Sequence, residues 1–133
     1  MLSLIYDYSY SGDVLIEELM TGQEVSVEVV VQNGVAYAVQ VTDKITTGPP
    51  HFIEIGHTQP SALPVDTINA VKDLACRAAI AVGLKNSIAH AEIFVTPSGP
   101  KMVEIAGRLG GGGIAEQLIK LSTGVNLPEI TLK

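Results

Sequence analysis

The order of apolar and polar residues predicts two antiparallel hairpins. β-Branched residues fill Val25–Gln32 and Val35–Thr42, and Asn33-Gly34 joins the two runs. Asn-Gly between such runs is the strongest short sequence signal for a hairpin turn. Both faces of these strands are largely apolar, so we expect the sheet to be covered on each side, or on one side by something outside this chain.

The second hairpin is predicted over His90–Arg108, where two β-rich runs flank the turn formers Pro97-Ser98-Gly99-Pro100. A loop of Pro97-Ser98-Gly99 would set its register. That register pairs Thr96 with Pro100, Phe94 with Met102, and Glu92 with Glu104. A slip of one residue in a single strand would instead place the two glutamates on opposite faces of the sheet.

A helix is predicted between the two hairpins. Pro64 suits its first turn, and Gly83 follows its end near Val82. Apolar residues recur through this segment at helical spacing, namely Ile68, Val71, Ala75, Ala78 and Val82. Two shorter helices are expected, one over 114–122 and one that starts at Leu127.

The remaining segments predict minor elements. Val14–Met20 is expected to form a strand that ends at Thr21-Gly22, and residues 52–57 a short edge or connecting strand. A strand-like alternation is also present at Tyr6, Tyr8 and Tyr10, and this segment is expected to lead into the first strand. The predicted fold class is therefore α+β, an antiparallel β-sheet with helices packed on it.

Composition limits the class of protein. The 133 residues are 47% hydrophobic, which suits one domain over 1–133. A net charge of -6 argues against a nucleic-acid backbone or an anionic membrane as the main partner. The single Cys76 forms no internal disulfide and favours a packing role over a reactive thiol. Without a signal-peptide pattern or a membrane-spanning apolar run, a cytoplasmic location is expected.

The predicted pairing of Glu92 with Glu104 requires an explanation. Like charges directly opposite each other on a sheet are destabilising. Either both side chains point into solvent, or a cation lies between them. Their apolar sequence neighbours favour the cation, and Mg²⁺ is commonly held by one or two carboxylates together with nucleotide phosphates.

Four motifs in order carry a family resemblance: Glu17–Glu24, Glu54–His57, His90–Glu92 and Glu104–Arg108. Together they resemble the C-terminal subdomain of an ATP-grasp ligase, in the amino-acid-ligase and carbamoyl-phosphate-synthase-like branch. The resemblance covers nearly the whole chain beyond Asp13. It implies the C-terminal half of the ATP-grasp fold, with ATP and Mg²⁺ as cofactors.

The resemblance assigns residues to the nucleotide and the metal. It implies that Glu92 and Glu104 bind magnesium. Much of the family has an asparagine where this chain has Ala106, so the resemblance supports one metal ion and leaves a second open. The residues implied for the nucleotide are Glu17, Glu18, Leu19 and Met20 at the adenine edge, Glu24 at the ribose, and Phe94 under the adenine ring.

The resemblance also assigns residues to the chemistry. Arg108 is implied to steady the transferring phosphoryl group, and its planar fork suits oxyanions. Glu54 would hold the ammonium of an amino-acid substrate. His57 would hold its carboxylate or a developing oxyanion, or would be a structural hydrogen bonder. Lys44 is a candidate to reach phosphate.

The run Gly110–Gly113 leaves two roles open. It lacks a following Lys-Ser/Thr, so it is not a Walker loop. It would offer backbone amides to an anion at a helix start, or act as a flexible connector.

The implied function is half of an ATP-dependent carboxylate–amine ligase that proceeds through an acyl phosphate. Its partners would be a small-molecule carboxylate and an amine. The N-terminal half of the fold, with a Lys-Pro strand and a glycine-rich flap, is not recognised in this sequence and would be supplied in cis or in trans. The alternative is a non-catalytic assembly module whose open half-cleft binds a partner or a second copy of the chain.

Overall fold

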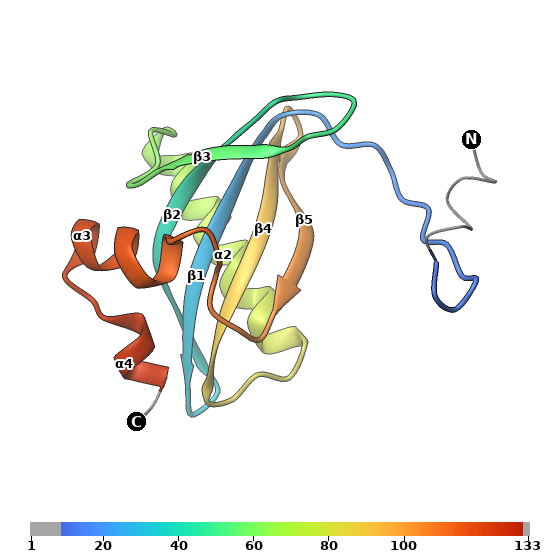
Figure 1. Ribbon diagram of the computed structural model, residues 1–133. Helices are drawn as coiled ribbons and strands as arrows, with labels where there is room; N and C mark the ends of the chain where they lie inside the picture. Colours follow the sequence, from blue (N-terminus) through green and yellow to red (C-terminus); the bar gives the residue numbers. More distant parts are fainter. Residues whose placement is uncertain (1–8, 132–133) are drawn as a thin grey trace.

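An antiparallel sheet forms the centre of the computed structural model, which describes residues 9–131 (Figure 1). Its five strands lie in the order β3-β2-β1-β4-β5. Their bounds are β1 Gln23–Gln32, β2 Val35–Thr46, β3 Glu54–Thr58, β4 Ser87–Thr96 and β5 Gly99–Ala106. The helical elements are α2 Val65–Ala81, the π-helical segment η1 Ile114–Leu118, α3 Ile119–Thr123 and α4 Leu127–Thr131. The predicted α+β class is confirmed.

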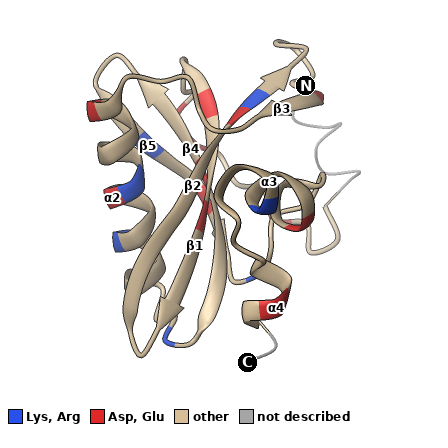
Figure 2. Cartoon of the chain, turned by 90° about the vertical axis from the view of Figure 1, so that its left-hand side faces the viewer, with Lys and Arg blue, Asp and Glu red and all other residues tan. Residues whose placement is uncertain are grey.

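Helix α2 covers one face of the sheet (Figure 2). It presents Val71, Ala75 and Ala79, all fully buried, to the strands. The facing strand positions are fully buried apolar residues at alternate sites, among them Val25 and Val27 of β1. The small alanines let the helix lie close to the sheet, and the predicted helix over 64–82 is confirmed.

The C-terminal helices cover part of the opposite face (Figure 2). Their buried side chains pack around Ile88 of β4 and the partly buried Val30 and Val39. The buried members from this segment are Ile114, Ala115, Ile119 and Leu127. Cover by this chain is therefore confirmed for the α2 face and only in part for the opposite face, where cover from outside the chain stays a prediction.

The two hairpins differ in how well their turns were predicted. Asn33 and Gly34 both have positive φ, 51° and 77°, and they close the first hairpin as expected. The second hairpin has a two-residue loop, Pro97-Ser98, so Thr96 pairs with Gly99 and not with Pro100. The hydroxyl of Thr96 accepts a hydrogen bond from the Ser98 amide and donates one to the Gly99 carbonyl, which closes the shorter turn.

A register shift restores the predicted glutamate pair. Phe94 pairs with Lys101, whereas the sequence predicted Met102. The ladder then shifts between Glu92 and Ile93, where Val103 of β5 is the additional residue, and Glu92 lies opposite Glu104 as predicted. The predicted register at the turn was therefore wrong, and the predicted pairing of Glu92 with Glu104 is confirmed.

The predicted strand over Val14–Met20 is wrong. Residues 13–21 contain neither strand nor helix, and they form an arm that extends away from the sheet (Figure 1). Backbone groups in a strand need a pairing partner, and this segment pairs with none of the five strands of the sheet. Tyr6 and Tyr8 of the predicted lead-in lie outside the described residues.

Membrane-spanning helices are not found in the described part of the chain. Among residues 9–131, every helix is too short or too polar to cross a membrane.

Candidate functional site

Strand alternation gathers charged residues on the face opposite α2. In β1, Glu24, Ser26 and Glu28 alternate with the buried valines. Cross-strand pairing places Ser26 beside Glu92 and Glu28 beside His90 on β4. This polar face is available because the C-terminal helices cover only part of it.

Lys44 of β2 lies at the centre of an acidic cluster. Its Nζ atom is 2.6 Å from Glu24 Oε1, 3.1 Å from Glu92 Oε2 and 3.3 Å from Glu54 Oε2. Only 8% of the Lys44 side chain is exposed. Burial alone would lower the Lys44 pKa, but contacts with Glu24 and Glu92 outweigh it and raise the pKa well above the usual range. The side chain therefore stays an ammonium.

A second group of buried charges extends the network toward the C-terminal loop. His90 Nδ1 lies 2.5 Å from Glu28 Oε1, and His90 Nε2 lies 3.4 Å from Glu92 Oε1. Burial opposes the charge on His90, but both carboxylates raise its pKa to about 9. The contact with His90 is in turn the main reason why the Glu92 pKa falls to about 2. Glu92 is thus an anion, and His90 a cation, at neutral pH.

The glycine run after Arg108 packs directly on these acid–imidazole pairs. The Gly110 amide donates to Glu28 Oε2 at 3.3 Å. A Cβ added to Gly110 would collide with both Glu28 and His90. The backbone needs glycine there because no space remains for a side chain.

His57 lies beside Glu54 under the same glycine run. Its Nε2 atom is 2.9 Å from Glu54 Oε1, and its side chain is 9% exposed. The contact lacks hydrogen-bond geometry, and within residues 9–131 this buried nitrogen finds no hydrogen-bond partner. A Cβ on Gly112 would come within 2.9 Å of His57 Cε1, so this glycine too lies against the ring.

A cleft of about 470 Å³ opens above the acidic cluster. It brings together eight residues that the sequence singled out: Glu18, Leu19, Met20, Glu24, Lys44, Glu54, Glu92 and Phe94. Thr46, Phe52 and Val103 complete its walls. The arm and all five strands therefore converge on one concave surface of the size of a small-molecule site.

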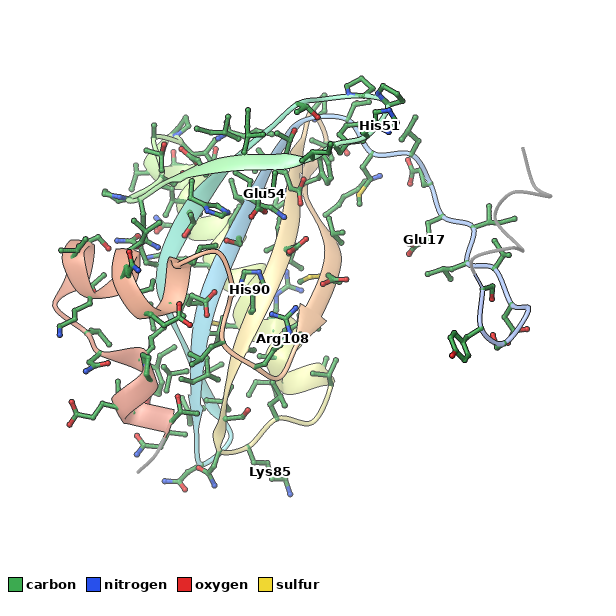
Figure 3. The ribbon with its side chains drawn as sticks, in the orientation of Figure 1. Glu17, His51, Glu54, Lys85, His90 and Arg108 are labelled. Atoms are coloured by element: carbon green, nitrogen blue, oxygen red, sulfur yellow. The ribbon has the colours of Figure 1, made fainter. Side chains whose placement is uncertain are left out.

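Four other predicted residues lie outside the cleft lining. Glu17 is exposed on the arm, whereas Arg108 lies over the sheet in the view of Figure 3. His57 lies next to two lining residues, since it is paired with Lys44 across the strands and its Nε2 atom lies near Glu54. Glu104 is exposed opposite Glu92, and the exposed Arg108 donates from Nη1 to the Leu109 carbonyl at 3.1 Å.

The positive charge expected beside Glu92 comes from the chain itself. Lys44 and His90 both contact its carboxylate. Within residues 9–131, no three His, Cys, Asp or Glu side chains are arranged to hold a metal ion.

Sequence reasoning missed the buried pair of Glu28 and His90 and gave Lys44 too small a part. Two signals were present. Glu28 lies two and four residues beyond Ser26 and Glu24, on the same face of the strand, and a charge among valines needs a partner. Lys44 likewise lies in a strand-like run with Val41, Thr42 and Ile45, so a buried ion pair was the natural expectation.

Comparisons with known proteins agree with this geometry. A family described as the ATP-grasp domain matches residues 4–116. The chain is 34% identical to carnosine synthase 1 of Gallus gallus over 102 residues, which are 77% of the chain and 11% of that protein. Its identity to carnosine synthase 1 of Mus musculus is 31%, over 84% of the chain and 14% of that protein. The chain thus spans only a small part of these relatives.

Solved structures show the same fold. An L-amino acid ligase from Bacillus licheniformis matches with a TM-score of 0.80 and 26% identity, over 86% of this chain and 29% of that one. A biotin carboxylase domain from Hydrogenobacter thermophilus, in complex with MgADP and bicarbonate, matches with a TM-score of 0.76 and 17% identity, over 98% of this chain and 30% of that one. With the family match extending over most of its length, the chain belongs to the ATP-grasp family.

Proposed function

We propose that this chain is the C-terminal half of an ATP-dependent carboxylate–amine ligase that binds MgATP. The observation that carries the proposal is the cleft, which gathers the residues expected at the adenine, the ribose, the metal and the substrate. These residues are far apart in the sequence, so their convergence is not a consequence of chain proximity. The similarity to an L-amino acid ligase and to carnosine synthases supports the reaction class.

The nucleotide occupies the end of the cleft formed by the arm and β1. Backbone groups of Glu18–Met20 are free to pair with the adenine edge, since this segment belongs to no strand or helix. Glu24 accepts from the ribose hydroxyls, and Phe94 packs under the ring. Glu17 contributes to the same adenine-binding segment, since it directly precedes Glu18 in the arm.

Magnesium is held by Glu92 and Glu104. The pair fits a hard cation, because the two carboxylates are opposite each other on β4 and β5 and Glu92 is kept ionised. Bound magnesium would offset the negative charge of the phosphates. Ala106 supplies no ligand atom from its side chain, which favours one ion over two.

The remaining polar residues serve the acyl transfer. The reaction phosphorylates a carboxylate and lets an amine displace the phosphate from the acyl phosphate. Arg108 binds the phosphoryl oxygens, Glu54 holds a substrate ammonium, and His57 is placed by Glu54 to donate to a carboxylate or oxyanion. The positive groups needed on the other side of the phosphates come from the other half of the fold, in cis or in trans.

Calorimetric titration with a non-hydrolysable ATP analogue and Mg²⁺ tests the binding part of the proposal. Glu24→Gln should weaken binding about tenfold or more, as expected when a hydrogen bond to a charged group is lost. Glu104→Ala should remove the dependence on Mg²⁺. Glu116→Gln, an exposed acid on η1, is the matched control and should bind like the wild type. Unchanged affinity in the first two variants would contradict the assignment.

Turnover tests the proposal that this chain is half of a catalytic unit. The chain alone should release little or no ADP, and addition of an N-terminal ATP-grasp half should restore ligation. Robust ADP release from the chain by itself would refute this part of the proposal.

A second candidate is a non-catalytic assembly module. The observation in its favour is the exposed apolar surface along the arm and beside β3, where Leu15, Ile16, Leu19, Ile53 and Ile55 are each more than half exposed. This candidate predicts a dimer by mass measurement in solution and no response to nucleotide. A monomer that binds MgATP would exclude it.

A further inference from the structure

Lys44 contacts three carboxylates, each of which binds a different ligand in the proposed function. Glu24 binds the nucleotide, Glu92 binds the metal and Glu54 binds the substrate amine. The three oxygens lie 2.6, 3.1 and 3.3 Å from the same Nζ atom. An ammonium has three N–H donors, so one donor is available for each carboxylate.

The ammonium therefore occupies the place where each ligand needs a free carboxylate. Its side chain is almost fully buried in the cleft wall, so the contacts are poorly screened by solvent. A divalent cation close to Glu92 would meet the positive charge of Lys44 at contact distance. Metal binding consequently requires Lys44 to move to another anion.

The floor of the cluster provides a second observation. Ser26 lies between Glu92 and Thr42 on the neighbouring strands and is fully buried. Its Oγ finds no hydrogen-bond partner within residues 9–131. A buried hydroxyl without a partner beside Glu92 is a donor that becomes useful when Lys44 leaves that carboxylate.

We infer that Lys44 couples the three subsites: it keeps divalent cations out of the empty cleft and transfers to the nucleotide phosphates when a nucleotide binds. The nucleotide supplies the anion that attracts Lys44, which frees the Oε2 atom of Glu92 for the metal while His90 stays at Oε1. By linkage, metal and nucleotide then strengthen each other's binding. This inference rests on the proposed function, but its first test uses the metal alone.

The test measures Mn²⁺ binding to the protein without nucleotide. The electron paramagnetic resonance signal of free Mn²⁺ reports how much of the ion remains unbound. Wild-type protein should not bind Mn²⁺ in the submillimolar range. Lys44→Met and Lys44→Gln should bind it at least about tenfold more tightly, within the range usual for coupling between sites. Lys120→Met removes the same charge from exposed α3 and should behave like the wild type.

A second titration with the ATP analogue measures the coupling itself. In the wild type, the analogue should tighten Mn²⁺ binding, and Lys44→Met should reduce this enhancement toward one. Tight Mn²⁺ binding by the wild type without nucleotide would overturn the inference, and this result needs no variant. Folded Lys44 variants that bind Mn²⁺ no better than the wild type would overturn it as well. Failure of the wild type to bind nucleotide would refute the proposed function. The measurements with metal alone are independent of that outcome, because they test whether Lys44 blocks the carboxylates in the empty cleft.

Discussion

The two faces of the sheet are built from the same strands and are stabilised in opposite ways. In β1, Val25, Val27 and Val29 pack against α2, while Glu24 and Glu28 point to the other side. The first face excludes water mainly with apolar side chains, and its one buried acid in the strands, Asp43, accepts hydrogen bonds from Ser61 Oγ and the Ala62 amide at the edge of the cluster. The second face buries Glu28 completely and satisfies it with His90 and the Gly110 amide.

This difference shows which interactions each face can lose. An apolar face tolerates small reductions in volume, since the loss scales with the area and cavity involved. A buried charge network loses more, because removal of one partner leaves the other charge uncompensated. The functional face should therefore be the more fragile of the two, and stability measurements can test this directly.

The largest effect is expected from Glu28→Ala. This substitution leaves His90 buried with only the 3.4 Å contact to Glu92. The free energy of unfolding should fall by about 3–5 kcal/mol, as for other broken buried pairs. Urea unfolding measures the change, and Glu17→Ala, an exposed acid of the arm, should stay within about 0.5 kcal/mol of the wild type. An equally small loss for Glu28→Ala would show that the pair contributes little.

A pH titration of stability should give the next largest effect. The folded-state pKa of His90, about 9, lies above the ordinary value of 6.5. Its contribution is therefore fully present below pH 6.5 and is lost as the pH rises through 9. The expected loss between pH 6 and pH 9.5 is on the order of 2 kcal/mol.

Urea midpoints at these two pH values measure the loss, and His90→Gln is the control. Burial also raises the pKa of Cys76, so the difference between wild type and His90→Gln isolates the histidine. The same fall in both proteins would contradict the assignment to His90. At the acid end the sign reverses, because the Glu92 pKa is lowered to about 2 and its contribution is lost only as the pH falls through that value.

The same contrast explains what could be predicted from the sequence. Periodicity identified the apolar elements, because burial of Val71 or Ala75 depends on local spacing that the sequence displays. The pairing of Glu92 with Glu104 was predicted from the turn, and it is correct because the shorter turn and the bulge at Val103 cancel each other. The bulge at Val103 and the two-residue turn depend on side-chain hydrogen bonds of Thr96 that spacing does not encode.

The charged network was the least predictable part. Lys44 and Glu92 are 48 positions apart, and Glu28 and Gly110 are 82 apart. Such contacts follow from strand order, which hairpin signals alone do not determine. The arm was misassigned as a strand for a related reason. The apolar run Val14–Ile16 has the composition of a strand, but the sequence does not show whether another strand is available to pair with it.

A smaller loss is expected on the apolar face. Ile93 of β4 is fully buried against the α2 side of the sheet. Ile93→Val removes one methylene and should lower the free energy of unfolding by about 0.5–1.5 kcal/mol. Urea unfolding measures this loss, and metal or nucleotide affinity should stay unchanged, because Ile93 faces away from the cleft. A loss as large as that of Glu28→Ala would remove the proposed distinction between the faces.

The smallest effect is expected at Ser26, which belongs to the charged face by position but makes no hydrogen bond there within residues 9–131. Ser26→Ala removes a buried hydroxyl that lacks a partner, so the free energy of unfolding should change by less than about 1 kcal/mol and can increase. Thr42→Ala is the comparison, since Thr42 accepts a hydrogen bond from the Gln59 amide at 2.7 Å and should lose more. If Ser26→Ala were the more destabilising of the two, the hydroxyl would have a partner in solution, and the charged face would be more completely satisfied than its contacts indicate.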